Sequence, residues 1–526
     1  MPADSTIFGE ESAILPRNFL FVPALLAGAA MLLAQTSNDP KARVLAWGEN
    51  PQAAMVQFGK IYAANCAGCH GENREGGAGP ALNAALIDAR TDDKLHATIQ
   101  NGRPGGMPAF KGALSEGEQW QLVNFLRFKA STPSSEPYLA PVNPAGLVVR
   151  SAKQTVKLEI VAAGLDTPWA VAFLPDGRKL VTERPGQIRI IDRDGRLLPG
   201  AVTGTPKPWV RQDGGFLDIA VHPNYGRNGW IYLSYSEVLP GHVVTPAEAK
   251  FSPLGSGADR IDPPSMTVIV RGRIDRKNRW IDNQLIFRAP AKFYSRDSSH
   301  YGSRFLFDHE GHLFFSLGEK GDMAQAQRLD SPLGKIHRIN ADGSVPADNP
   351  FVKTPGAIPT IWSYGHRNPE GLAFDPATGL MWESEHGPVG GDELNIVEKG
   401  KNYGWGVVSM GSQPGIDQRS APGMMPPITY YIPAIAPSGI AFYNGARYPA
   451  WKGNLFVAAL AGQLRRVEVS GRAVTGQEVI FQRLGRTRAV YTGPDGLLYV
   501  LVHRFVRPGT AGTPPQGWLL RLQPES

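Results

Sequence analysis

One pattern recurs from residue 170 to the end of the chain, and it limits the folds that the chain can adopt. It consists of an alternating apolar run, a turn rich in Asp, Asn, Pro and Gly, and a second alternating run. Its six copies begin at Ala170, Asp218, Phe305, Gly371, Gly439 and Ala489. Each copy has the signature of a β-hairpin, and copies about fifty to ninety residues apart are typical of blades repeated around an axis. The pattern predicts an all-β, six-bladed β-propeller. A β-sandwich is the main alternative, but it does not require the same hairpin six times.

The region before the repeats contains both cysteines of the chain, in the run Cys66-Ala67-Gly68-Cys69-His70. A C-x-x-C-H run is the attachment signal for c-type haem, in which two thiols bind the haem and the histidine coordinates iron. A zinc site would need further Cys or His at ligand spacing, and a redox dithiol would not need the histidine. We therefore expect one covalent haem c on Cys66 and Cys69, with His70 as an iron ligand.

A second iron ligand is suggested by Met107, which stands in the turn Gly105-Gly106-Met107-Pro108. The turn lies between the haem motif and an amphipathic run from Ser115 to Phe128 that predicts a closing helix. Ligation by His and Met raises the potential of a haem, which suits an electron acceptor; the alternative is a packed loop side chain. Residues 50–130 resemble a class I cytochrome c, a small all-α domain, and the resemblance implies His70 and Met107 as axial ligands.

The N-terminal sequence and the net charge indicate where the protein is located and which partners it can have. Residues 19–34 form an apolar run of sixteen, so we expect residues 1–35 to be a cleaved export signal or, alternatively, a membrane anchor. Because haem c is attached on the far side of the membrane, both readings place the protein in the periplasm. A net charge of +7 over 526 residues, without a basic run, predicts no nucleic-acid partner. Residues 131–153 begin with a Ser/Pro-rich stretch without periodicity and are predicted to be a linker to a propeller domain over 154–526.

Polar residues gather just before several predicted inner strands of the propeller. His300 precedes one strand, and the run from Tyr364 to Leu372 places an imidazole, a guanidinium and an amide before another. Arg486 and Arg488 lie two residues apart in an extended segment, so both side chains share one face and can bind carboxylates. Solvated loop charges are the alternative for each, but their common position predicts that they converge on one mouth.

From about residue 157 to 524 the chain resembles the soluble glucose/aldose dehydrogenases that use pyrroloquinoline quinone (PQQ). The motifs that carry the resemblance are Thr167-Pro168-Trp169-Ala170, His300-Tyr301-Gly302-Ser303-Arg304, Tyr364-Gly365-His366-Arg367-Asn368-Pro369, Glu385-His386-Gly387-Pro388, Gly391-Asp392-Glu393-Leu394-Asn395, Asn402-Tyr403-Gly404-Trp405 and Arg486-Thr487-Arg488. The resemblance implies His300 as the general base that takes the substrate hydroxyl proton and Arg367 as the cation beside the reacting quinone oxygen. It implies Asn368, Arg486 and Arg488 as PQQ contacts.

The same resemblance implies two calcium sites. The backbone carbonyls of Gly387 and Pro388 match those that bind the Ca²⁺ next to PQQ, where a hard cation with oxygen ligands makes the quinone more electrophilic. Glu393 and Tyr403 match a second, structural calcium site.

Four positions depart from the family pattern. Asp213 stands where a glutamine is expected, Ser299 where a carboxylate precedes the base, Ala434 where a threonine lies near the cofactor, and Ala461 where a lysine contacts PQQ. Ser299 would remove a partner that orients His300. The changes leave the base and the arginines in place but put glucose in doubt as the substrate.

These observations predict a quinohaemoprotein oxidoreductase that oxidises a sugar (aldose) or a related alcohol or aldehyde. Electrons would pass from PQQ to haem c in the same chain, and then to a periplasmic cytochrome or terminal oxidase. Two alternatives stay open: a dehydrogenase for sorbosone or another aldehyde, and a non-catalytic haem-bearing propeller that binds a partner.

Overall fold

The computed structural model describes residues 51–131, 143–250, 262–504 and 515–525. The predicted signal or anchor over residues 1–35 lies outside these ranges, as does much of the predicted linker. Within them, no helix is both long enough and apolar enough to cross a membrane.

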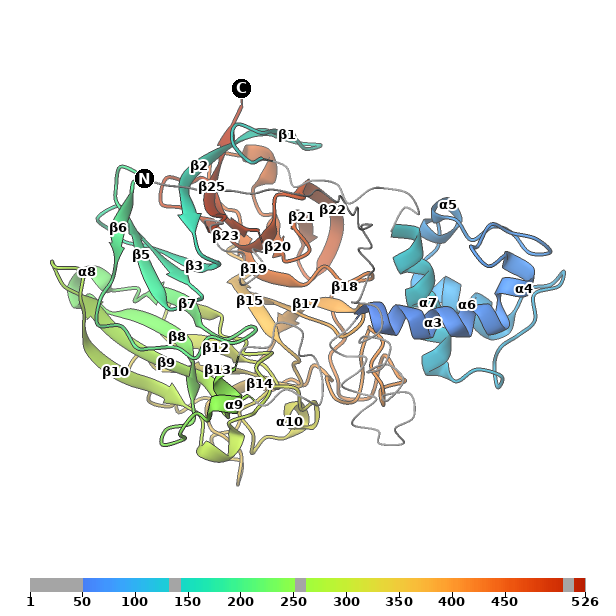
Figure 1. The fold of residues 1–526 in the computed structure, drawn as a ribbon, viewed down its shortest axis with the longest axis horizontal. Helices are drawn as coiled ribbons and strands as arrows, with labels where there is room; N and C mark the ends of the chain where they lie inside the picture. The colour runs from blue at the N-terminus through green and yellow to red at the C-terminus, as the bar shows by residue number, and fades with distance from the viewer. Residues whose placement is uncertain (1–50, 132–142, 251–261, 505–514, 526) are drawn as a thin grey trace, which may run out of the picture.

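Six antiparallel sheets are arranged around one axis, as a β-propeller (Figure 1). Five of the sheets have four strands each. In order from the inner strand outward they are β3 (Pro168–Phe173), β4 (Lys179–Glu183), β5 (Gln187–Ile191), β6 (Leu197–Ala201); β7 (Phe216–Val221), β8 (Ile231–Val238), β9 (Ser265–Ile274), β10 (Trp280–Arg288); β11 (Phe305–Phe307), β12 (Leu313–Leu317), β13 (Lys335–Ile339), β14 (Ile361–Tyr364); β15 (Pro369–Phe374), β16 (Met381–Glu385), β17 (Asp392–Val397), β18 (Thr429–Tyr431); and β19 (Pro437–Phe442), β20 (Leu455–Ala459), β21 (Gln463–Ser470), β22 (Ala473–Gln482).

The sixth sheet joins the two ends of the propeller. Its order is β23 (Arg486–Thr492), β24 (Leu498–His503), β25 (Gly517–Pro524), β2 (Thr155–Leu165) and β1 (Val148–Arg150). Strand β2 pairs with β25 from Val156 opposite Pro524 to Leu165 opposite Gly517. This pairing closes the ring with hydrogen bonds. Residues 148–150 were predicted to belong to the linker; they instead form β1, because β2 offers them an unpaired edge.

The six predicted hairpins are the inner two strands of the six blades, which confirms the six-bladed fold. The second strand of each hairpin is deeply buried, because neighbouring blades cover both of its faces: every residue of β4, β12, β16, β20 and β24 is buried. Apolar residues fill the space between blades in clusters that hold the ring together.

Strand direction decides where the site lies. All inner strands start at one end of the axis, and each antiparallel second strand ends there. The register shows this directly: Pro369 at the start of β15 lies opposite Glu385 at the end of β16, and Arg486 lies opposite His503 in the same way. Residues that precede inner strands and residues that follow second strands therefore meet at one mouth.

Short helical turns interrupt the blade connections. They are α8 (Tyr225–Asn228), α9 (Pro246–Ala249), α10 (Ala324–Gln327), η1 (Ala291–Phe293) and η2 (Pro449–Trp451).

Residues 51–131 form a separate helical domain. Its helices are α3 (Pro51–Asn65), α4 (Ala67–His70), α5 (Ala84–Asp88), α6 (Asp92–Asn101) and α7 (Glu116–Ser131). The predicted closing helix is α7, three residues longer at its C-terminal end than the amphipathic run. Its apolar residues pack with α3 and α6 around Phe58, Leu95 and Val123.

Helix α7 also provides contacts between this domain and the propeller (Figure 1). The side-chain amide of Asn124 donates to the backbone carbonyl of Val389 at 3.3 Å and to the hydroxyl of Ser412. The Arg419 guanidinium lies 3.4 Å from the centre of the Trp120 ring, and the Tyr430 hydroxyl donates to Asp92 of α6 at 3.0 Å. In the same view, α4 lies at the opposite end of the domain from the propeller.

Candidate active site

His300 lies in the loop before β11 with its imidazole held by a carboxylate. Nδ1 is 2.9 and 2.8 Å from the two carboxylate oxygens of Glu319, which follows β12. Glu319 is buried and His300 is partly exposed, with 16% of its side chain accessible. A proton on Nδ1 that points at a carboxylate leaves the Nε2 lone pair free to accept a proton, which is the arrangement of a general base.

The loop that contains His300 and the loop that follows β12 both have strained backbone, and polar contacts hold them together. His300 in the first and Lys320 in the second have φ of +50° and +58°, and a non-glycine residue in this region costs about 1–3 kcal/mol. The buried Lys320 ammonium donates to the carbonyl of Ser299 at 2.7 Å, and the Ser299 amide donates to Asp297 at 2.6 Å. Burial lowers the pKa of Lys320 to about 7, although the Asp297 carboxylate acts against this shift.

These contacts correct one expectation. Ser299 was predicted to remove a partner that orients His300, but Glu319 supplies a carboxylate to the imidazole from the neighbouring strand. The Ser299 hydroxyl instead donates to Asp297 and helps to shape the loop.

Arg367 and Asn368 lie in the loop before β15, beside the His300 loop. The Asn368 side-chain oxygen accepts from the amide of Gly302 at 3.1 Å, and so ties the two loops together. The Arg367 amide donates to Glu385 at 2.6 Å, and its guanidinium donates to the carbonyl of His386 at 3.2 Å. The guanidinium Nε of Arg367 is buried and has no hydrogen-bond partner among the described residues.

Glu370, which was not predicted as a site residue, holds several of these groups. Its carboxylate accepts from the Arg488 guanidinium at 2.7 Å, from the Ser438 hydroxyl at 2.8 Å and from Asn368 at 3.2 Å. Burial would raise the pKa of Glu370, but His386 and Arg488 lower it to about 2. Glu370 is therefore a permanent anion that orients Arg488.

A group of nitrogen-bearing side chains surrounds Arg488 on the sixth blade and its neighbour. Arg486 lies at the start of β23, Arg184 follows β4, and His503 ends β24. Burial, together with the charges of Arg488, Arg486 and Arg184, lowers the pKa of His503 to about 2, so this imidazole is neutral. The Nε atoms of Arg184 and Arg488 and Nδ1 of His503 are buried without partners among the described residues.

Such a group of unpaired donors fits a ligand with several carboxylates. PQQ is a quinone that carries three carboxylates, and the predicted contacts Arg486 and Arg488 both belong to this group. The donor set therefore fits the predicted cofactor, although Ala461 offers no side-chain donor.

The predicted calcium ligands line a cavity beside Arg367. Gly387, Pro388, Glu393 and Tyr403 all border it. Among the described residues, the carbonyls of Gly387 and Pro388 accept no hydrogen bond, which fits oxygen ligands for a hard cation. The Tyr403 hydroxyl is different, because it donates to the carbonyl of Ile396 at 2.6 Å and accepts from the amide of Glu398 at 2.8 Å. Any part that Tyr403 plays at a calcium ion must therefore come from its backbone.

The haem motif forms a single helical turn in the N-terminal domain. His70 ends α4 and is buried, and its Nδ1 lies 2.8 Å from the carbonyl of Pro80. A proton on Nδ1 that is given to this carbonyl leaves Nε2 free for iron. Cys66 and Met107 both pack against the apolar cluster of the domain, and Cys69 is exposed. The apolar surroundings and the oriented imidazole fit the predicted haem.

Residues 165–506 match the family model described as glucose/sorbosone dehydrogenase. The chain belongs to the glucose/sorbosone dehydrogenase family. Residues 53–126 match a second model, described as cytochrome c oxidase, cbb3-type, subunit III, so this dehydrogenase carries an N-terminal cytochrome c domain.

Similar proteins agree with this assignment. Aldose sugar dehydrogenase YliI of Escherichia coli is 37% identical over 374 residues, which cover 69% of this chain and 94% of that protein. The crystal structure of the soluble aldose sugar dehydrogenase from Escherichia coli in the apo-form matches 70% of this chain and all of its own, with a TM-score of 0.61 and 35% identity. The PQQ-bound aldose sugar dehydrogenase from Streptomyces coelicolor matches 71% of this chain and 99% of its own, with a TM-score of 0.55 and 28% identity.

Four residues of this dehydrogenase site were missed from the sequence: Glu370, Glu319, Arg184 and His503. Glu370 lies at the start of the inner strand β15, and the other three lie at or just after the end of the second strand of a hairpin, the position that Gly387 and Pro388 take in the fourth blade. The repeat itself was therefore the available signal, because equivalent positions in all six copies reach the same mouth.

Proposed function

We propose that the chain is a quinohaemoprotein that oxidises an aldose, or a related alcohol or aldehyde, and passes the electrons to its own haem c. The proposal rests on the family assignment, the His300–Glu319 pair and the arginines of the mouth, several of whose buried Nε atoms have no partner among the described residues.

His300 is proposed to start the reaction by accepting the hydroxyl proton of the substrate on Nε2. Glu319 holds the imidazole through Nδ1 and stabilises the positive charge that appears on the ring when the proton arrives. The partial exposure of His300 lets a polar substrate reach it from the mouth.

Arg367 is proposed to stabilise negative charge that develops opposite His300. Its guanidinium is fixed by the carbonyl of His386 and lies 5.2 Å from the Trp405 ring, so it needs little rearrangement to do so. PQQ, when bound with Ca²⁺, supplies the electron acceptor, and Arg184, Arg486, Arg488 and the carbonyls of Gly387 and Pro388 would hold the pair.

One loop contacts both domains, which supports the proposal that they work together. Gly387 and Pro388 line the cavity of the active site, whereas the next residue, Val389, packs into the apolar cluster of the cytochrome domain. The Val389 carbonyl also accepts from Asn124 of α7. Three consecutive residues thus link the proposed cofactor site to the domain that carries the haem motif.

The side of the cytochrome domain that faces away from the propeller suits electron transfer from the haem to an external acceptor. Because α4 lies at the end away from the propeller (Figure 1), its haem would be open to an external acceptor. We propose that this acceptor is a periplasmic cytochrome or terminal oxidase, and that the protein works in the periplasm after export or on a membrane anchor.

A donor panel tests the proposal. The full-length haem protein is reconstituted with PQQ and Ca²⁺ and mixed with aldoses, sorbosone and simple alcohols, and the reduced haem spectrum is recorded. We expect rapid haem reduction with at least one sugar or aldehyde, and none without PQQ. A preference for sorbosone would change the substrate but not the reaction. Failure of every donor, with no PQQ retained, would support the non-catalytic alternative and overturn the proposal.

A further inference from the structure

A second cluster of possible metal ligands lies in the fourth blade, next to the active site, and its Glu385 also lines the cavity beside Arg367. It contains His366 from the loop before β15 and Glu383 and Glu385 from β16, and one donor atom from each lies within 4.8 Å of the others. His366 and Glu383 are fully buried, and Glu385 is 4% exposed. No role in the proposed reaction needs Glu383.

The sheet register explains how the carboxylates gather. Residues two apart in a strand share a face, so Glu383 and Glu385 of β16 point the same way. Across the ladder they face Asn395 and Glu393 of β17. Three glutamates therefore lie on one face, two of them buried and Glu393 partly exposed, with a single amide between them.

This negative charge has little compensation. The Asn395 amide nitrogen lies 3.0 Å from Glu383, 3.2 Å from Glu385 and 3.2 Å from Glu393, but an amide has only two N–H groups for three carboxylates. Among the described residues, no Lys or Arg side chain forms an ion pair with any of the three. An unpaired carboxylate is costly to bury, and the cost is removed either by a proton or by a bound cation.

Unpartnered atoms point to where a cation would bind. Within the part of the chain that the structure describes, neither Nδ1 of His366 nor Oε1 of Glu383 has a hydrogen-bond partner. The other ring nitrogen of His366 lies 2.8 Å from the Ser363 hydroxyl, so a proton there leaves Nδ1 as a free lone pair. Nδ1 is 3.5 Å from Oε1 of Glu385, close to the roughly 3.4 Å between two ligands on a tetrahedral ion with bonds of about 2.0–2.1 Å.

We propose that His366, Glu383 and Glu385 bind a divalent first-row transition-metal ion, Zn²⁺ in the first instance. The imidazole favours such an ion over Ca²⁺, which distinguishes this site from the two calcium sites predicted around Gly387 and Glu393. The ion joins the loop before β15 to the β16–β17 hairpin. Since Glu385 also accepts from the Arg367 amide, the ion fixes the position of Arg367 as well.

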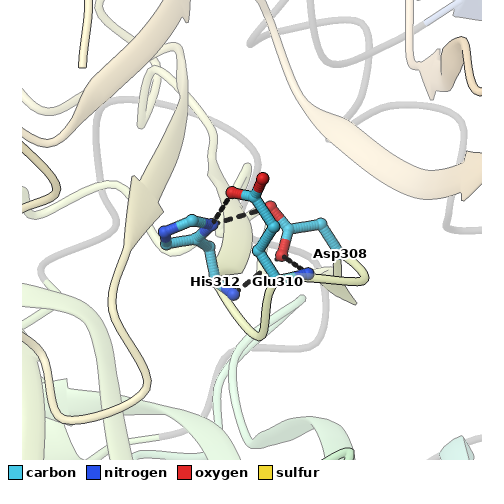
Figure 2. A group of neighbouring side chains, drawn as sticks. All are labelled: Asp308, Glu310 and His312. Carbon is cyan, nitrogen blue, oxygen red and sulfur yellow. Dashed lines mark hydrogen bonds and ion pairs between the residues drawn. The ribbon is translucent and has the colours of Figure 1, made fainter. Parts of the chain in front are cut away.

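A similar set of side chains on the third blade provides a matched comparison. Asp308, Glu310 and His312 come together in the turn between β11 and β12 (Figure 2). Here the Arg338 guanidinium lies 3.0 Å from Nδ1 of His312 and 3.8 Å from Glu310, and the Glu310 side chain is 59% exposed. A cation of the protein already occupies this cluster, so we expect no metal there.

Elemental analysis of the full-length haem protein tests the proposal. After incubation with Zn²⁺ and dialysis, we expect close to one zinc per haem iron in the wild type and in Glu310→Gln. In Glu383→Gln we expect at least a tenfold loss of zinc. No zinc or other first-row ion beyond haem iron in the wild type would overturn the proposal, as would equal zinc in Glu383→Gln and wild type, or calcium in its place.

Zinc-edge X-ray absorption of the wild type provides a test that does not depend on whether the variant folds. We expect a shell of nitrogen and oxygen donors with the outer scattering of a single imidazole. A spectrum without imidazole, or with more than one, would overturn the assignment. Neither measurement uses a sugar or PQQ, so their outcomes are independent of the proposed dehydrogenase activity.

Discussion

The imidazole of His300 and the carboxylate of Glu319 form a pair at the propeller mouth, with Nδ1 at 2.9 and 2.8 Å from the two carboxylate oxygens. The pair joins the loop before one inner strand to the end of its hairpin partner, nineteen residues later in the chain. It sets the direction in which the free ring nitrogen points, which is the property that a general base needs.

The first prediction concerns this pair. His300→Ala is expected to abolish haem reduction by substrate, while reduction by dithionite stays normal. Glu319→Gln keeps the size of the side chain but removes the negative charge that holds the His300 imidazole. We therefore expect kcat to fall by roughly 10²-fold, with PQQ retained. Stopped-flow haem reduction measures both. A Glu319→Gln protein with wild-type kcat would show that the carboxylate has no such role.

Glu370 is predicted to govern stability in acid. Because the folded-state pKa of Glu370 is lowered to about 2 by His386 and Arg488 against the effect of burial, its stabilisation is complete above its ordinary value near 4.5. It is lost as the pH falls from there through 2. Glu370→Gln should lower the free energy of unfolding at pH 7 by about 3–5 kcal/mol and flatten this part of the acid dependence. Denaturant unfolding at pH 7 and at a series of values from about pH 4.5 down to about pH 3 measures both effects, and an unchanged acid slope would contradict the prediction.

Lys320 is predicted to make the free energy of unfolding depend on pH in the alkaline range. Its folded-state pKa is lowered by burial to about 7, so between that value and its ordinary one the unfolded chain holds the proton more tightly. Stability therefore rises from pH 7 to pH 9, by up to about 1.4 kcal/mol per pH unit. Lys320→Met should remove the rise, whereas Lys292→Met, at an exposed position, should keep it. Urea unfolding at the two pH values distinguishes the cases, and a rise that survives Lys320→Met would assign it to other groups.

Met107 is predicted to set the haem potential. If its sulfur ligates the iron, Met107→Leu removes the ligand that raises the potential, and the midpoint should fall. Met55→Leu replaces a buried methionine of the same domain and should leave the midpoint unchanged. Redox titration, followed by the haem absorption band, measures the midpoint potential of each variant. Equal midpoint potentials in the two variants would exclude Met107 as the ligand.

Arg419 is predicted to hold the two domains together. Its guanidinium on the Trp120 ring is worth about 0.5–2 kcal/mol, so Arg419→Ala should partly release the cytochrome domain. We expect a larger maximum dimension in small-angle X-ray scattering, with unchanged circular dichroism. Arg276→Ala, in an exposed turn of the second blade, serves as the control, and an unchanged scattering curve for Arg419→Ala would contradict the prediction.

Local patterns were enough to predict the blades and the haem motif. A hairpin depends on residues adjacent in sequence, so alternation and a turn mark it wherever it lies, and six copies specify the ring. The C-x-x-C-H run is equally local. The pairing of β2 with β25 was not predictable in this way, because it joins residues more than 350 positions apart. Strand β1 pairs with the nearby β2, but its three residues carry no alternation long enough to mark a strand.

The sequence by itself determined the six-bladed propeller, the helical domain with Cys66, Cys69 and His70, and the loops from which His300, Arg367 and Arg488 arise. Only the tertiary structure decided the partners of these groups: Glu319 for His300, Glu370 for Arg488, and Val389 for Asn124. The physical reason is that a hydrogen bond or ion pair depends on distance in space, and strand register brings together side chains whose separation along the chain carries no such information.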